Sequence, residues 1–344
     1  MEDGRLLKEC ERLKGPAEAV ALERKLLAAQ RGDVAGVEKE LIAAVQKKHP
    51  DAVLILEALA QGYHEACRPL EEHRALLEWL LHKPDDPQAL YRLGRVIEQR
   101  ARVHNGNWNR GPDARALEHY RRAVKADPKF DAVRLALAEG LLEQNNADEA
   151  LKHFQRLRER RPKDRALVLG VARCEILLGR TEEGTKLLDR LLADDPGDAR
   201  ALAERGSVAL QEGQVAKAES LLRQALKRAP ADYTTTYRLS MCLKLAGKEN
   251  EAQATLARLK RLQADRDRLN DCLKATERTS QDPAPRAEAG AILLRIGQEE
   301  EGLRWLRSAL RADPKHKPTH RALADYYQRK GDKERAAQHQ RLAQ

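Results

Sequence analysis

Apolar residues recur along this chain in a helical pattern that repeats at a fixed distance. Prolines stand at 128, 162, 196 and 230, three successive intervals of 34 residues, and another stands at 314. The same segment precedes each of them, with a small residue followed by two apolar positions, as in Ala150, Phe154 and Leu157. This spacing places the apolar residues on one face of a helix.

A second helical pattern comes before that segment in each interval. It pairs an apolar residue with a small one, as in Leu137-Ala138, and it usually ends at a glycine. Glycine tolerates the positive φ that ends a helix, and the proline stops the second helix. The pattern therefore predicts a series of helix–turn–helix units whose paired helices approach closely through small residues. The turn glycines are Gly179, Gly213, Gly247, Gly297 and Gly331.

These residues resemble the tetratricopeptide repeat (TPR) family, whose helix–turn–helix unit has the same length and pattern. The resemblance implies an all-α fold, a right-handed superhelical solenoid of antiparallel helix pairs, with about nine repeats and no strands. Each pair in such a stack contacts only its neighbours, so the core layers are thin and need few large rings. The aromatic content of 3% agrees with this arrangement.

The strength of the pattern divides the chain into four segments. Residues 1–86 are expected to hold N-terminal helices and degenerate repeats, and residues 87–266 the main array with a loop insertion at 101–113. Residues 267–282 continue an extended helix into a proline-containing linker. The last repeats and a polar cap follow at 283–344. The extended helix is expected to end before the sequence TSQDPAP, where two prolines break it.

The family resemblance also indicates a binding surface. In TPR arrays the first helix of each pair lines the concave side, and in this chain the corresponding row is largely apolar with basic residues beside it. Such a row is expected to bind a peptide or an amphipathic helix of a partner protein. An alternative is that the chain's own N-terminal helix at 5–13 covers it. The candidate residues are Leu135, Glu139, Leu142, Leu169, Arg173, Ile176, Arg200, Ser207, Leu210, Tyr237, Met241 and Lys244.

Two departures from the repeat are further candidates for binding. Trp108 lies in the loop insertion and could anchor a ligand, although folding of the ring back onto its own helix pair is the favoured alternative. The long helix at 250–277 carries leucines near one face. These leucines could join two copies in a homo-oligomer or pack against the next repeat of the same chain.

Two other functions remain open alternatives to a scaffold for a protein partner. The superhelix could enclose an apolar small molecule or lipid as a carrier. Electrostatic nucleic-acid binding is less favoured, although 64 Lys and Arg against 54 Asp and Glu give a net charge of +10. Basic residues alternate with acidic ones, as on a solvated helix face, and the apolar row has few rings on which bases could stack.

Motifs for catalysis or metal binding are not found in the sequence. There is no GxSxG, HExxH or dinucleotide-binding glycine pattern. His64, Cys67 and His73 are separated by a proline, and His316 and His320 flank another, so neither group has the spacing of a metal site. We therefore expect a protein without enzymatic activity, cofactor or metal.

The cysteines and the first residues of the chain indicate the cellular location to expect. The five cysteines are scattered and never form a CxxC pair, which favours reduced thiols over a disulfide framework. Cys174 and Cys242 share one repeat position and are expected to be small packing residues. The chain as given starts without a signal peptide and contains no apolar run of about 18 residues. These features predict a cytoplasmic protein without a membrane span.

Overall fold

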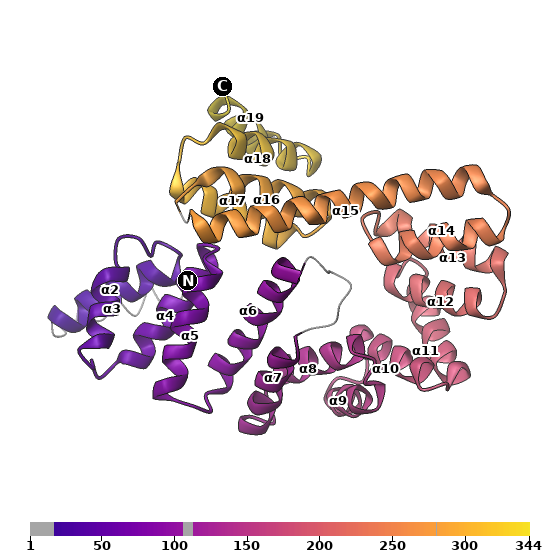
Figure 1. Cartoon of the computed structure of the whole chain (residues 1–344), viewed down its shortest axis with the longest axis horizontal. Helices are drawn as coiled ribbons and strands as arrows, with labels where there is room; N and C mark the ends of the chain where they lie inside the picture. The colour runs from indigo at the N-terminus through magenta and orange to yellow at the C-terminus, as the bar shows by residue number, and fades with distance from the viewer. Residues whose placement is uncertain (1–16, 106–112, 280) are drawn as a thin grey trace. The chain divides into compact units, whose positions relative to one another are not determined.

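The computed structural model describes residues 17–105, 113–279 and 281–344. These residues form eighteen α-helices and no strand, which confirms the all-α prediction (Figure 1). The helices are α2 (Ala17–Gln30), α3 (Glu38–Gln46), α4 (Ala52–Glu65), α5 (Pro69–His82), α6 (Pro87–Asn105), α7 (Ala114–Ala126), α8 (Asp131–Glu143), α9 (Ala147–Arg160), α10 (Arg165–Leu177), α11 (Thr181–Asp194), α12 (Ala199–Gln211), α13 (Val215–Arg228), α14 (Tyr233–Leu245), α15 (Glu249–Arg278), α16 (Pro283–Arg295), α17 (Glu299–Ala312), α18 (Lys317–Arg329) and α19 (Lys333–Leu342).

Contacts within the chain group these helices into two compact units. Unit 1 contains the described residues of Met1–His104 together with Asp271–Leu294 and Glu299–Gln344. Unit 2 contains the described residues of Asn105–Asn270 and Arg295–Gln298. Unit 1 thus joins parts of the chain that are far apart in sequence, and its composition differs from the four segments drawn from the repeat pattern.

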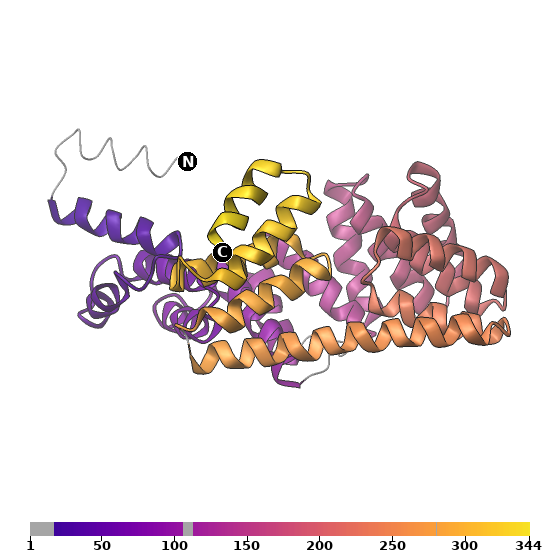
Figure 2. The ribbon, with the colours of Figure 1, turned by 90° about the horizontal axis from the view of Figure 1, so that it is seen from above.

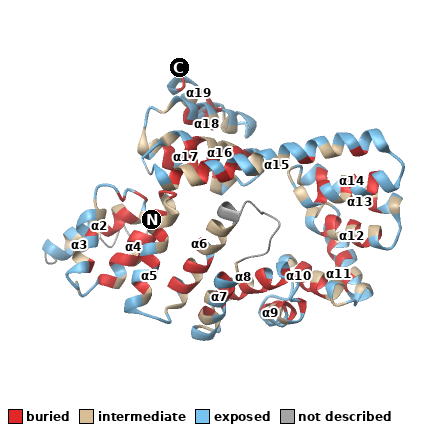
Figure 3. Ribbon diagram, viewed as in Figure 1, coloured by how far each residue is buried: buried red, intermediate tan, exposed pale blue. Residues whose placement is uncertain are grey.

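Unit 2 is a stack of helix pairs. The first helices of successive pairs, α8, α10, α12 and α14, contact one another in turn, and α9, α11 and α13 pack beside them. Each of these helices carries both buried and exposed residues (Figure 3). Phe154, Leu188 and Leu222 occupy the predicted bulky position of the repeat and are at most 1% exposed. The paired-helix prediction is therefore confirmed.

The turn glycines have the predicted backbone conformation. All five have φ between 71° and 86°, a region that is open to glycine but strained for most side chains. In the repeat that begins at Asp131 the same position is taken by Asn145, whose φ is 59°. Asparagine is one of the few other residues that adopt this conformation at a helix C-terminus.

A small residue allows the two helices of a pair to touch at Gly184. A Cβ atom on this residue of α11 would lie 2.7 Å from the carbonyl oxygen of Ala172 and 2.6 Å from Cγ1 of Ile176, both on α10. Both distances are too short for a carbon contact. The two helices therefore cross more closely than alanine would permit.

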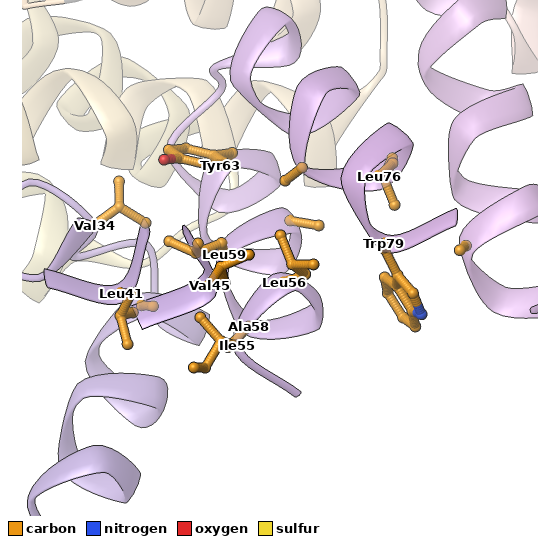
Figure 4. Close-up of a cluster of buried hydrophobic side chains, with 14 of the residues drawn as sticks. Val34, Leu41, Val45, Ile55, Leu56, Ala58, Leu59, Tyr63, Leu76 and Trp79 are labelled. Atoms are coloured by element: carbon orange, nitrogen blue, oxygen red, sulfur yellow. The ribbon is translucent and has the colours of Figure 1, made fainter. Parts of the chain in front are cut away.

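In unit 1 the helices α2 to α6 share one apolar core. Ile55, Leu59, Leu76 and Trp79 lie at its centre and are at most 2% exposed (Figure 4). This part of the chain is thus helical with a packed interior, and its assignment to degenerate repeats stays a prediction. Gly32 forms the turn after α2, with φ at 86°, as its place between two helical patterns indicates.

Side chains of α17 bind the C-terminal ends of two N-terminal helices within unit 1. Nη1 of Arg311 donates to the carbonyl oxygen of Glu65 and Nη2 donates to that of Arg31, both at 2.7 Å. Oγ of Ser308 donates to the carbonyl oxygen of Ala66, also at 2.7 Å. The last carbonyls of a helix have no partner within it, so these bonds satisfy the ends of α2 and α4.

The predicted extended helix is present as α15, which runs without interruption for 30 residues (Figure 2). It ends at Arg278, directly before the TSQDPAP sequence, because prolines follow. Of the predicted leucine stripe, Leu259, Leu269 and Leu273 are buried within the chain, whereas Leu256 and Leu262 are half-buried.

Candidate partner-binding surface

The twelve predicted binding residues lie on four neighbouring helices of unit 2. Three come from each of α8, α10, α12 and α14, and these helices contact one another in sequence. Because all of them occupy equivalent positions in successive repeats, the stacking brings them into one row. We refer to this row as the A-helix row. Its members differ widely in exposure.

Two leucines of the A-helix row are buried, contrary to their predicted place on an open surface. Leu142 is 2% exposed and Leu169 is 8% exposed. Leu169 packs in a cluster with Leu188 and Ala201, so this side chain fills the space between adjacent repeats. A leucine is long enough to reach the neighbouring helix, and a buried one contributes to stability rather than to ligand contact.

Other members of the A-helix row have intermediate solvent exposure. Leu135, Ile176, Ser207 and Leu210 are half-buried, as is Arg173. Half-buried apolar side chains can form the floor of a binding surface, but they need more exposed neighbours to hold a ligand. The polar members at the rim, Glu139, Arg200 and Lys244, are exposed.

Among the four helices of the A-helix row, α14 has the most exposed large apolar side chains. Tyr237 is 49% exposed, Met241 is 40% exposed and Leu245 is 65% exposed. Residues four apart lie above one another on a helix, so these three form a stripe along one face, which we call the α14 stripe. Leu245 was not among the predicted binding residues, although its position four residues after Met241 places it on the same helix face. Leu177, at the same repeat position of α10, is 50% exposed.

The charges beside the row are partly neutralised within the protein. Oε1 of Glu204 on α12 lies 3.5 Å from Nε of Arg173 on α10 and 3.6 Å from Nη1 of Arg238 on α14. The carboxylate of Glu204 therefore links three successive helices and pairs with Arg173, one of the predicted residues, and with Arg238. Arg200 and Lys244 remain as exposed basic residues at the rim.

The cysteines behind this surface have the environment of packing residues. Cys174 and Cys242 are fully buried, as predicted from their shared repeat position. Burial raises the pKa of the Cys174 thiol to about 12 and also raises the pKa of Cys242. Sγ of Cys242 lies 3.3 Å from the carbonyl oxygen of Val215, to which it donates. Both thiols stay protonated at neutral pH and are poor nucleophiles.

The histidines considered as metal ligands have other partners. Nδ1 of His64 lies 3.2 Å from Oε2 of Glu72, and its Nε2 lies 2.8 Å from Nη1 of Arg304. His320 contacts the carbonyl oxygen of Pro314 through Nε2 at 3.0 Å. In the described part of the chain, no group of three or more His, Cys, Asp or Glu residues is placed to hold a metal ion.

Two predicted elements lie outside the described residues, namely Trp108 and the N-terminal helix at 5–13. Their expected contacts with a ligand or with the A-helix row stay predictions. Across the helices that the structure does describe, none combines the length and the apolar character needed to cross a membrane.

Comparison with solved structures gives several distant similarities. A tetratricopeptide repeat protein from Parabacteroides merdae has 14% sequence identity and a TM-score of 0.47, covering 83% of this chain and 97% of its own. The type IV pilus biogenesis factor PilW has 18% identity and a TM-score of 0.47, with 60% and 92% covered. The human IFIT1 dimer with PPP-AAAA has 15% identity and a TM-score of 0.44, with 98% and 84% covered.

Comparison with sequence families identifies the repeat itself. Among curated protein sequences there is no significant match. Two family profiles described as tetratricopeptide repeat do match, one at residues 114–168, 141–204 and 209–273 and the other at 178–233. Together these ranges span residues 114–273, which include the helices α7 to α14 of unit 2. Residues 114–273 of this chain therefore consist of tetratricopeptide repeats.

Proposed function

We propose that this protein is a non-enzymatic scaffold that holds a segment of a partner protein on the A-helix row, with the α14 stripe as its centre. The TPR fold supports a protein-interaction role in general. The observation that carries the finer proposal is the α14 stripe, because three large apolar side chains exposed in a line are unusual on a surface that contacts only water.

The chemistry of the stripe favours an apolar segment with regular spacing. Tyr237 offers a rigid ring with a polar tip, and Met241 offers a flexible thioether that adapts to different partners. An amphipathic helix can place apolar residues on such a stripe at intervals of three or four. Lys244 at the rim would then meet an acidic residue of the partner.

Matched substitutions test the proposal. Met241→Glu places a charge within the α14 stripe, whereas Gln224→Glu places the same charge on an exposed part of α13. We expect Met241→Glu to lose most of the proteins captured specifically from the native cell, and Gln224→Glu to retain them. Circular dichroism should show equal helix content, since both positions are exposed. Equal capture by both variants would refute binding at the α14 stripe.

The carrier alternative is distinguished by a separate measurement. A carrier should retain an apolar molecule through purification, so native mass spectrometry would show an added mass that organic extraction removes. The scaffold proposal expects the mass of the polypeptide alone. A homo-oligomer through the long helix would appear in the same spectra as a multiple of that mass.

A further inference from the structure

A pocket lined by basic residues lies in unit 2, on elements other than the α14 stripe. It is formed where the turn between α7 and α8 meets the C-terminal half of α9, and its volume is about 310 Å³. This volume is at the lower end of the range found for small-molecule sites. We call it the basic pocket. Its lining residues are Pro128, Lys129, Asp131, Arg134, Arg156 and Arg160.

Positive charge in the basic pocket exceeds negative charge. Four of the lining side chains are basic and one is acidic, which gives a net charge of +3. The single carboxylate is already engaged, because Asp131 lies 2.5 Å from Nη1 of Arg160 and 3.8 Å from Nε of Arg161. Arg156 is exposed and forms no ion pair with any described residue.

Arg134 is the buried member of this group. Arg134 is only 7% exposed, and its Nη2 donates to the carbonyl oxygen of Pro128 at 2.7 Å. Nη1 lies 3.3 Å from Nδ1 of His153. Burial, and next the positive charge of Arg134, lower the pKa of His153, so the imidazole is neutral at pH 7. Neither hydrogen-bond partner therefore supplies a negative charge to the buried guanidinium.

The repeat itself does not require an arginine at this place. In the next two repeats the residue equivalent to Arg134 is Val168 and then Leu202. The position of His153 is taken by Leu187 and Leu221 in the same repeats. An aliphatic pair thus satisfies the packing between the two helices. A buried cation costs desolvation free energy that an aliphatic residue does not, unless an anion compensates it.

We propose that the basic pocket binds a phosphate monoester. A phosphate dianion neutralises more of the +3 charge than a single carboxylate does. Guanidinium groups also match phosphate oxygens with paired, charge-assisted hydrogen bonds. Arg156 and Lys129 at the mouth contact the incoming group, and Arg134 contributes a fixed positive charge at the base. This site is independent of the partner surface on α14.

Isothermal titration with O-phospho-L-serine tests the proposal on the full chain. We expect saturable binding of one molecule per chain, tighter than that of glutamate, and an affinity that falls as salt is added. The phosphate probe and glutamate share an amino-acid backbone, so the difference isolates the phosphate. An absence of saturable binding, or equal affinity for both probes, would overturn the proposal.

Substitutions in equivalent positions of two repeats locate the site. Arg156→Gln should weaken binding by about tenfold or more, the usual effect of losing a hydrogen bond to a charged group. Arg190→Gln removes the equivalent arginine of the next repeat and should leave the affinity unchanged. Asp131→Asn should tighten binding, because it removes the one lining carboxylate, and a tightening cannot result from unfolding. Equal losses for both arginine variants, or no gain for Asp131→Asn, would contradict the assignment.

The source of the phosphate is decided by comparing probes. A phosphoserine within a peptide would bind more tightly than free O-phospho-L-serine if the ligand is a modified protein. Inorganic phosphate or the free phosphoamino acid would bind at least as tightly if the ligand is a small phosphorylated metabolite. Both results require the same pocket and support the proposal.

Discussion

Gly184 shows how the absence of one methyl group sets the distance between two helices. The carbonyl oxygen of Ala172 lies where a side chain would begin, and backbone cannot move aside as a flexible side chain can. Gly36 offers a contrast, because a Cβ there would have no heavy atom within 4 Å. Comparing substitutions at the two glycines therefore distinguishes the cost of a clash between helices from the effect of replacing a glycine where there is space.

We predict that Gly184→Ala lowers the free energy of unfolding by about 1–3 kcal/mol, the usual cost of forcing extra volume into a packed contact. Gly36→Ala should change it by less than about 0.5 kcal/mol. Urea unfolding followed by circular dichroism measures both. A neutral effect of Gly184→Ala would mean that the helices of the pair are further apart than described.

Residues whose role is set by backbone conformation or helix spacing could be predicted from the sequence. The turn glycines were recognisable because their repeat position demands positive φ, and Cys174 because it shares a position with Cys242. The exposure of Leu142 and Leu169 could not be predicted, since it depends on how closely the next repeat approaches. The Arg134–His153 pair had a signal, because aliphatic residues replace both in the following repeats.

Helix ends in unit 1 are stabilised by residues from a distant element. Arg311 of α17 binds carbonyl oxygens at the ends of α2 and α4, where the partial negative charge of each helix is concentrated. Nothing in the repeat pattern indicates this contact, because the repeat specifies neighbours and these helices are distant in sequence. It was therefore not predictable from spacing alone.

Removing this cap should destabilise unit 1. Arg311→Ala should lower the free energy of unfolding by about 1–3 kcal/mol, because hydrogen bonds between a charged group and two helix-end carbonyls are lost. Arg307→Ala, on an exposed position of the same helix, should have an effect below about 0.5 kcal/mol. Hydrogen exchange should also become faster at the ends of α2 and α4 in Arg311→Ala. Equal behaviour of the two variants would exclude the capping role.

Two repeats have a pair of polar side chains at the same positions, one on each helix of the repeat. His320 and His339 stand at the same distances from Pro314 as Arg134 and His153 stand from Pro128. Nδ1 of His320 lies 2.9 Å from Nδ1 of His339, so only one of the two nitrogens can carry the shared proton. Burial, and next the neighbouring His320, lower the pKa of His339. Burial also lowers the pKa of His153.

These shifts predict a loss of stability on acidification. His153 and His339 each bind a proton less readily in the folded chain than in the unfolded one, where the ordinary pKa is 6.5. The unfolded state is therefore favoured as the pH falls through that value. We expect a lower melting temperature at about pH 5.5 than at about pH 7.5. The double variant His153→Leu, His339→Leu should reduce the difference, and an unchanged difference would contradict this assignment.

At the scale of the whole molecule, the repeat period predicted the fold class but not the grouping into two units. Helix pairs follow from local spacing, and the described residues form helices throughout, with α8·α9, α10·α11 and α12·α13 in contact as pairs. Unit 1 instead depends on contacts between its N-terminal and C-terminal parts, which a periodic pattern does not encode. The proposed binding surface was predictable as a row of repeat positions. Its proposed centre on α14 was not, because it follows from the exposed fractions of the side chains in the folded chain.

Site-specific photo-crosslinking in the native cell tests the central claim, that a partner segment contacts the α14 stripe. A benzoylphenylalanine placed at 241 should form a covalent adduct with a discrete protein, because a bound segment would lie against this side chain. The same probe at 224, exposed on α13, should not form that adduct. An adduct at 241 alone is the predicted result. No adduct at 241, or the same adduct at both positions, would contradict the proposed surface.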